Sequence, residues 1–536
     1  MSDAALTTSS DLLTLADDLV TTGLVSLAAR GGSDDHQSFA YDLAHSASAL
    51  STARAAVAYG RHGETESALA SAFVGLAICD LANRVLGREE LWGTTADWFA
   101  PFADFVARQR DPAVLAALAE TPGERHLGDE YTMVADTFHR FALEQVRPHA
   151  EHVHRDNADI PETIIDGLNE LGGFGLSVPT QYGGFATGGE SEYLAMVVAT
   201  EELSWGALGV GGSLITRPEI LTRALITGGT EDQKSRWLPA LASAEVLAAI
   251  AVTEPDFGSD VAGVSTAATK TEGGWLLSGT KTWCTFAARA EVLAVLARTD
   301  PDRAKAHRGL SLFLVEKPRG DSTGFRFDQH ASVEGRSDPN GRLEGRPIDT
   351  LGYRGMHSYE LSFDHWFVPD GDLVGQDAGL GNGFYYQMAG FENGRLQTAA
   401  RAIGVMQASY EAARDYARDR VVFGRPILDY ELTRVKLGTM ATIIQSSRQF
   451  AIHVARLMGT GEGTLEASMA KAYACRAAEW VTREAMQIHG GMGYAEEYPV
   501  SRYFVDARVL SIFEGADETL CLKVIARRLL ENIENR

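Results

Sequence analysis

The chain has 536 residues, of which 45% are hydrophobic and 22% are charged, so it is long enough for several globular domains and too apolar to be wholly disordered. Its 48 basic and 72 acidic residues leave a formal net charge of −24 at pH 7. This acidic balance argues against a dedicated nucleic-acid binder and against a protein held on membranes by basic patches. It does not exclude a local basic pocket for an anionic cofactor.

Cysteine usage and the N-terminal segment indicate the cellular compartment. The four cysteines are far apart and show no CxxC spacing, which excludes a disulfide framework and most cysteine-based zinc sites. The first residues, MSDAALTTSSDL, lack the basic and apolar regions of a signal peptide. The longest apolar stretches, such as Glu291–Ala297, are far shorter than a membrane span. We therefore expect a soluble cytoplasmic protein with no membrane segment, no metal and no nucleic-acid partner.

Residues 1 to about 120 have the pattern of helices. Ser9-Ser10-Asp11 offers an N-cap for a helix with leucines at helical spacing, and Gly31-Gly32 is expected to end it. A second helix carries Leu69, Phe73 and Leu76 among small residues. These helices either cover the core and influence assembly, or pack there without a further role. We favour the second, purely structural alternative.

The pattern changes twice further along the chain. Pro122-Gly123 is a typical boundary pair, and helices are expected from there to about residue 249. Short apolar runs separated by turns then predict strands, although residues 317–349 are rich in Gly, Arg, Asp and Pro and are expected to form a long surface excursion. From about residue 381 the helical period returns, with one helix expected to end at Gly459. The predicted fold class is α+β, with an N-terminal helical extension (1–122), a helical domain (123–249), a central β-domain (250–375) and a C-terminal helical bundle (376–536).

Six short motifs occur in a fixed order after residue 250. They are AVTEPDFGSD (251–260), GTKTWCT (279–285), GYRG (352–355) with VP (368–369), RDRVVFGRPI (418–427), QIHGGMGY (487–494) and IFEG (512–515). The common dinucleotide-binding, P-loop, serine-hydrolase, zinc-protease and calcium motifs are absent. The order and spacing of the six motifs resemble the acyl-CoA dehydrogenase family over about residues 125–536.

The resemblance implies FAD-dependent α,β-dehydrogenation of an acyl-CoA, with an electron-transfer flavoprotein as acceptor and a homodimer or homotetramer as the assembly. Within the family, the helical extension and the sequence pattern of residues 211–221 and 350–359 resemble a branch that acts on a short branched dicarboxylic acyl-CoA. The leading hypothesis is oxidation of (2S)-methylsuccinyl-CoA to mesaconyl-CoA, as in the ethylmalonyl-CoA route. The alternatives are another short-chain or glutaryl-type dehydrogenase, an acyl-CoA oxidase, and a non-catalytic binding protein of the same fold.

Glu514 is the candidate catalytic residue. Removing the weakly acidic α-proton of a thioester requires a base, and a carboxylate in a dry pocket is suitable because desolvation raises its pKa. By resemblance Glu514 is that base, and Gly515 lets the backbone approach the substrate. A lone Glu-Gly pair is more often a solvated turn, but the neighbouring motifs favour the catalytic role. Some family members carry the base just ahead of the residue that matches Arg395, and here that position is Gly394.

The resemblance also assigns residues to FAD. Arginine suits a pyrophosphate, and glycine lets the main chain approach it closely, so we expect the motifs at 418–427 and 487–494 to meet the ADP half of a FAD bound mainly by a neighbouring subunit. Taken alone, Trp283 would more often be a core residue. The residues expected at FAD are Ala251, Val252, Thr253, Ser259, Trp283, Thr285, Arg420, Phe423, Gln487, Gly490 and Gly491.

Five residues are expected at the substrate: Ser259, Arg395, Gly515, Thr216 and Arg217. The second carboxylate of a methylsuccinyl group needs a cation, because a buried lone carboxylate is costly. A guanidinium can bind it through two nitrogens, so Arg217, helped by the Thr216 hydroxyl, is the candidate partner. The alternative is that Arg217 pairs with Glu219 or packs at a helix bend made by Pro218.

Overall fold

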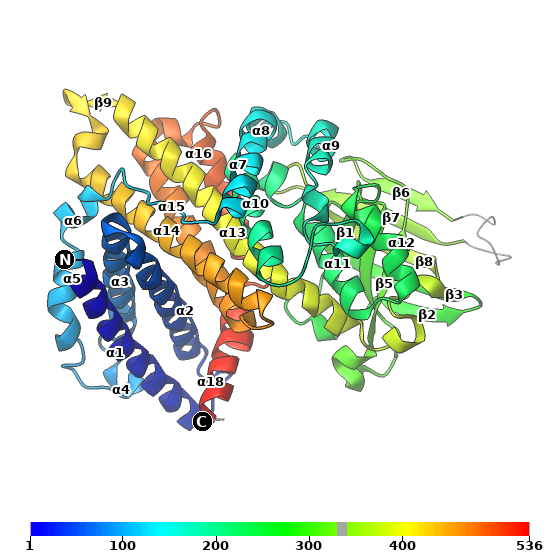
Figure 1. Cartoon of the computed structure of the whole chain (residues 1–536). Helices are drawn as coiled ribbons and strands as arrows, with labels where there is room; N and C mark the ends of the chain where they lie inside the picture. The colour runs from blue at the N-terminus through cyan, green and yellow to red at the C-terminus, as the bar shows by residue number, and fades with distance from the viewer. Residues whose placement is uncertain (1, 330–339, 535–536) are drawn as a thin grey trace. The chain divides into compact units, whose positions relative to one another are not determined.

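The computed structural model describes residues 2–329 and 340–534, and the chain divides into two compact units. One, the helical unit, combines residues 1–138 with residues 395–536, and the other, the sheet unit, comprises residues 139–394. The predicted α+β class is confirmed, because helical segments precede and follow a central segment of strands (Figure 1).

The N-terminal extension begins with a long helix whose start differs from the prediction. α1 starts at Ser2 and runs through residues 9–11, so the N-cap expected there is wrong. The predicted stop at Gly31-Gly32 is confirmed, since both glycines have positive φ and the Gly32 amide donates to the Leu27 carbonyl. The extension contains α1 (Ser2–Ala29), α2 (Gln37–Tyr59), α3 (Glu64–Val85), α4 (Glu89–Trp92), α5 (Ala103–Gln109) and α6 (Pro112–Ala117).

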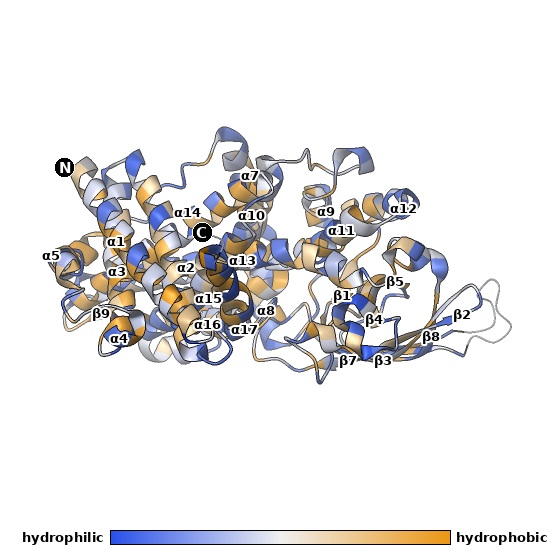
Figure 2. Cartoon of the chain, turned by 90° about the horizontal axis from the view of Figure 1, so that it is seen from below, coloured by the Kyte–Doolittle hydropathy of each residue, from blue (hydrophilic) through white to orange (hydrophobic). Residues whose placement is uncertain are grey.

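α1 and α3 also correct the expectation that no apolar stretch is long enough to span a membrane. Residues Ala4–Ala29 and Glu64–Val85 are long and apolar enough by composition, a test that core helices of globular proteins also pass. In α3, 61% of that window is buried, with Phe73 and Ile78 inaccessible to solvent. Figure 2 shows hydrophilic residues along both helices. The apolar side of α3 therefore belongs to the core of the helical unit.

The C-terminal helices share that core with the extension. α2 packs against α14 and α15 and against the π-helix Leu520–Ala526, and Figure 1 shows α2 and α3 beside α14 and α15. The helix predicted to end at Gly459 does so. The segment contains α13 (Gly383–Asp419, shared with the sheet unit), α14 (Glu431–Gly459), α15 (Thr464–His489), α16 (Pro499–Leu510), α17 (Asp517–Thr519) and α18 (Arg527–Glu534).

Helices and one large sheet form the other unit. The helices are α7 (Asp129–Phe141, which starts in the helical unit), α8 (Arg147–Arg155), α9 (Glu162–Glu170), α10 (Glu190–Gly206), α11 (Thr216–Gly228) and α12 (Glu231–Ala242). The strands are β1 (Ala248–Ala251), β2 (Ala267–Thr271), β3 (Gly274–Thr285), β4 (Val292–Arg298), β5 (Leu310–Glu316), β6 (Phe325–Asp328), β7 (Arg342–Ile348) and β8 (Ser358–Pro369). Their order is β1-β4-β2-β3-β8-β7-β6, with β5 paired to β4.

The sheet is covered on both faces around β4. Leu293, Val295 and Ala297 point into one hydrophobic cluster, and Val292, Ala294 and Leu296 point into the other, which includes residues of α11 and α12. A strand buried on both faces is usually a continuous apolar run, and β4 is such a run apart from its last residue, Arg298.

The surface excursion predicted for residues 317–349 is wrong in part. β6 and β7 lie within it and extend the sheet beyond β8. Their buried residues alternate with exposed or half-buried charged ones, so their composition resembles that of a loop. Residues 330–339 of the same segment lie outside the described residues.

Candidate active site

Glu514 lies in a strained loop between α16 and α17. Its φ is 53° and that of Gly515 is 99°, and a left-handed conformation is uncommon for a residue other than glycine. Such conformations cost about 1–3 kcal/mol and persist only where the surroundings impose them. The Glu514 side chain is only 4% exposed, so this loop directs a carboxylate into the helical unit.

Two residues of α13 bind that carboxylate. The terminal nitrogens of Arg401 lie 3.2 and 3.3 Å from Glu514 Oε1, and the Thr398 hydroxyl donates to Oε2 at 3.2 Å. Arg401 is fully buried. A guanidinium at this distance gives the buried carboxylate a partner, which fixes where its oxygens lie. Neither residue was predicted from the sequence; their i, i+3 spacing puts them on one helix face but does not link them to Glu514.

α15 holds the next residue of the loop. Lys471 is buried, and its ammonium donates to the Gly515 carbonyl at 2.6 Å. Burial lowers the pKa of Lys471, and the charges of Glu514 and Asp517 oppose that shift. Arg395, expected at the substrate, donates to the Ser468 hydroxyl of α15 at 3.3 Å. The structure thus brings Arg395, Gly515 and Glu514 to the same part of the helical unit.

The residues expected at the flavin ring lie in the sheet unit, after β1 and at the end of β3. The Thr282 amide donates to the Thr253 carbonyl at 2.8 Å, which joins the two segments. Trp283 sits where the register of β3 on β8 shifts, with φ of 57° and 57% of its surface exposed. A bulge re-aims a side chain, so Trp283 presents its indole outward and is not a core residue. Thr285 is buried with its hydroxyl 3.3 Å from that of Ser358, and Ser259 is exposed.

A buried ion pair fixes the segment that follows β1. The Lys281 ammonium donates to the Val252 carbonyl at 2.9 Å and to Glu254 Oε1 at 2.8 Å. The Glu254 carboxylate also accepts hydrogen bonds from the amides of Ser265 and Thr266. Burial alone would raise the pKa of Glu254, but the charge of Lys281 and these hydrogen bonds outweigh it and lower the pKa to about 2. The sequence analysis missed this pair, which holds Ala251, Val252 and Thr253 in place.

The residues expected at the ADP half of FAD lie in the helical unit. Two short strands, β9 (Val421–Val422) and β10 (Arg425–Pro426), form a hairpin with positive φ at Phe423 and Gly424, the pattern of a type I′ turn. Phe423 is 94% exposed. The ring of His489 stacks on Tyr416 at 4.2 Å, which joins the C-terminal ends of α15 and α13. The five residues concerned, Arg420, Phe423, Gln487, Gly490 and Gly491, are all exposed.

Thr216 and Arg217 begin α11, and both are buried. A terminal nitrogen of Arg217 lies 3.4 Å from the Tyr353 hydroxyl. Burial raises the pKa of Cys284 on β3 to about 12, while the charges of Lys281 and Arg217 oppose that shift. Arg217 therefore lies near the β3 segment that carries Trp283.

Buried hydroxyls occur in and just before α11, the helix that carries Arg217. Those of Ser213, Thr216 and Thr222 have no hydrogen-bond partner among the residues that the structure describes. Buried polar atoms are usually satisfied, so this arrangement fits a polar ligand group. Glu219, the alternative partner of Arg217, accepts a hydrogen bond from Asn393 and lies 3.8 Å from Arg223.

Comparisons with known proteins cover the chain from residue 128 onward. Three family models match it in order: acyl-CoA dehydrogenase N-terminal domain (128–245), middle domain (249–366) and C-terminal domain (381–530). (2S)-Methylsuccinyl-CoA dehydrogenase of Cereibacter sphaeroides is 44% identical over 413 residues, which are 77% of this chain and 71% of that protein.

Two solved structures are similar throughout their length. Butyryl-CoA dehydrogenase from Megasphaera elsdenii has a TM-score of 0.67 and 29% identity over 76% of this chain and 99% of its own. A glutaryl-CoA dehydrogenase from Mycobacterium smegmatis in complex with FADH2 has a TM-score of 0.66 and 26% identity over 77% of this chain and 97% of its own.

Proposed function

The chain belongs to the acyl-CoA dehydrogenase family, and we propose that it oxidises (2S)-methylsuccinyl-CoA to mesaconyl-CoA and passes the electrons to an electron-transfer flavoprotein. The family is FAD-dependent and its members are oxidoreductases that act on a CH–CH group. The observation that carries the proposal is the buried Glu514 carboxylate, held by Arg401 in a loop of imposed geometry. The 44% identity to a methylsuccinyl-CoA dehydrogenase supports the substrate.

Glu514 removes the α-proton of the thioester in this proposal. The carboxylate accepts the proton, and the electron pair of the broken C–H bond becomes the new double bond as the β-hydrogen leaves with its own pair. A bound FAD would supply the acceptor for that β-hydrogen and its electron pair. Arg401 holds the Glu514 carboxylate by a buried ion pair at 3.2 Å, and the burial of both side chains keeps competing water away from the base.

The residues that would hold FAD fit its chemistry in two places. The outward indole of Trp283 and the fixed backbone of Ala251–Thr253 suit the flat ring and its polar edge. The exposed Arg420 and the Gly490-Gly491 backbone suit a pyrophosphate.

The almost fully exposed Phe423 supports a homodimer or homotetramer, because an aromatic side chain so presented is suited to a second subunit. The four cysteines are all free, which supports a cytoplasmic location.

Arg217 binds the second carboxylate of the substrate in this proposal. A buried guanidinium close to buried hydroxyls is suited to a carboxylate and costly beside a plain hydrocarbon chain. These residues therefore favour a dicarboxylic acyl-CoA over a fatty acyl-CoA. A glutaryl-type substrate shares the second carboxylate, so the length of the acyl chain is a matter for assay.

The proposal is tested by mixing the FAD-loaded protein without oxygen with (2S)-methylsuccinyl-, succinyl-, glutaryl-, isovaleryl- and butyryl-CoA. Methylsuccinyl-CoA is expected to bleach the flavin absorbance fastest and to yield mesaconyl-CoA. Fastest bleaching by glutaryl-CoA with release of CO2 would identify a glutaryl-type enzyme instead, and peroxide formation in air an oxidase. No bleaching by any ester would contradict the enzymatic role.

Replacing Glu514 by Gln keeps the shape of the side chain and removes the base. Turnover of methylsuccinyl-CoA with an artificial electron acceptor is expected to fall at least ~10²-fold, the lower range for loss of a positioned acid–base group. The ratio of flavin to protein absorbance should stay that of the parent. Rapid flavin reduction in this variant would show that another residue is the base, and Glu392 would be the first to test.

Changing Arg217 to Met removes the cation while retaining a long side chain. Activity with methylsuccinyl-CoA is expected to fall, and preference for the uncharged isovaleryl-CoA to rise, because the second carboxylate loses its partner. The kcat/KM ratio for the two esters measures this, and Arg217→Lys, which keeps the charge, should shift that ratio less. Equal losses on both esters would show that Arg217 does not select the carboxylate.

A further inference from the structure

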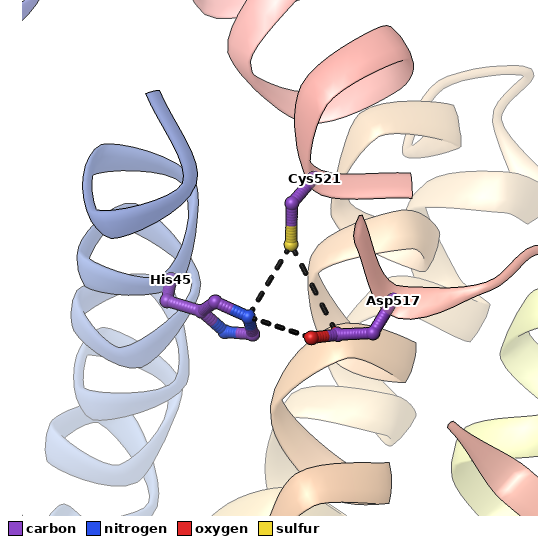
Figure 3. Close-up of side chains that lie close together, drawn as sticks. All are labelled: His45, Asp517 and Cys521. Carbon is purple, nitrogen blue, oxygen red and sulfur yellow. Dashed lines mark hydrogen bonds and ion pairs between the residues drawn. The ribbon is translucent and has the colours of Figure 1, made fainter. Parts of the chain in front are cut away.

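Asp517, three residues after Glu514, is bound by side chains of the N-terminal extension. The Tyr41 hydroxyl of α2 donates to Asp517 Oδ2, and His45 Nε2, one turn further along α2, lies 3.0 Å from the same oxygen. The Cys521 sulfur lies 3.4 Å from that nitrogen (Figure 3). His45, Asp517 and Cys521 are buried.

The contact acts on the loop that carries the base. The Asp517 amide donates to the Ser511 carbonyl at 3.0 Å, which closes the loop around Glu514. Burial alone would raise the pKa of Asp517, but the hydrogen bonds from His45 and from the Tyr41 hydroxyl, with the charge of Arg476, lower it overall. Without those partners Asp517 would be a buried charge with less compensation, which is strongly unfavourable. The closing residue of the loop therefore depends on α2.

Three helices hold three residues of this loop. Arg401 of α13 binds the Glu514 carboxylate, Lys471 of α15 binds the Gly515 carbonyl, and α2 binds Asp517. The first two helices belong to the part of the chain that the C-terminal family model covers, whereas α2 precedes all three models. The extension thus makes a direct contact with the catalytic loop.

We propose that Tyr41 and His45 are positioning residues that fix Glu514 through Asp517. The proposal rests on Glu514 being the catalytic base. It gives the N-terminal extension a part in the reaction without any contact to substrate or cofactor. Loss of either side chain lets the loop relax from its left-handed backbone conformation, so the base leaves its working position while the binding residues stay.

The same donors raise a second interpretation, a metal site, since the His45, Asp517 and Cys521 donor atoms lie within 4.8 Å of one another. The hydrogen bonds favour positioning. Asp517 Oδ2 is already shared by Tyr41 and His45, and the single nitrogen His45 Nε2 faces both Asp517 and Cys521. These contacts satisfy the buried groups without an ion, so metal binding is an outcome that the test must distinguish.

The variants are Tyr41→Phe and His45→Leu in the full-length, FAD-loaded protein, with His45→Gln as a conservative variant that keeps a donor. The matched control is Tyr59→Phe, which removes a tyrosine hydroxyl from the same helix, there bonded to the Glu124 carbonyl at 2.9 Å. Tyr41→Phe and His45→Leu are expected to lower kcat about tenfold or more, as small displacements of reacting groups do, with KM and FAD content close to the parent. His45→Gln should recover part of the loss, and the control should keep its kcat.

Amide hydrogen exchange of the peptide 511–519 gives a readout that does not depend on activity. Exchange is expected to quicken in Tyr41→Phe and in His45→Leu and to stay unchanged in Tyr59→Phe. If exchange quickens in the variants but none of the acyl-CoA esters bleaches the flavin of the parent protein, the proposed function is wrong, whereas the contact between α2 and the loop is supported. Unchanged kcat and exchange in both variants, or one zinc ion per chain that survives dialysis and is lost in His45→Leu, would overturn the proposal.

Discussion

The buried ion pair between Arg401 and Glu514 is the interaction on which the candidate site depends. Transferring either charge out of water costs several kcal/mol, and the cost is recovered only by a well-placed partner. The Glu514 backbone cannot relax to an ordinary conformation without withdrawing the carboxylate from Arg401. The strain of the loop and the ion pair therefore support each other, and side chains of α13, α15 and α2 hold successive residues of this segment.

The sheet unit also contains a buried ion pair, next to the segment after β1 that is expected at the flavin ring. Lys281 and Glu254 are buried together, and their hydrogen bonds fix the backbone after β1 and tie it to β3. Apolar residues in these positions would give comparable or greater stability, but they would not hold carbonyl and amide groups at set distances. In both units the buried charges are best understood as fixing the geometry of a backbone segment that carries functional groups.

The sequence predicted the parts of the structure that local patterns record. Continuous apolar runs indicated β4 and β5, glycines marked the ends of α1 and α14, and the ordered motifs led to Glu514. The local pattern gave a wrong N-cap at Ser9. The hydroxyl of this residue donates to the Ala5 carbonyl inside α1 and so does not cap the helix. The local pattern also misled at β6 and β7, where exposed charges gave two strands the composition of a loop.

The partners of the site residues were beyond the reach of local pattern. Arg401 is 113 residues from Glu514, and His45 is 472 residues from Asp517. Neither spacing leaves a periodicity in the sequence, and a buried arginine or histidine looks like any other helix residue until the helices pack. The leucine spacing therefore predicted that the N-terminal helices exist, but only the packed structure shows what they contact.

The most direct test of the central claim is the rate of flavin reduction in FAD-loaded Arg401→Gln, mixed with (2S)-methylsuccinyl-CoA in the absence of oxygen. The amide retains hydrogen bonding but removes the charge that pairs with the buried Glu514 carboxylate. We predict that FAD stays bound and that bleaching slows about tenfold or more, in line with loss of an electrostatic contact at the reacting group. Bleaching at the parent rate would show that the ion pair does not position the base, and would contradict the account.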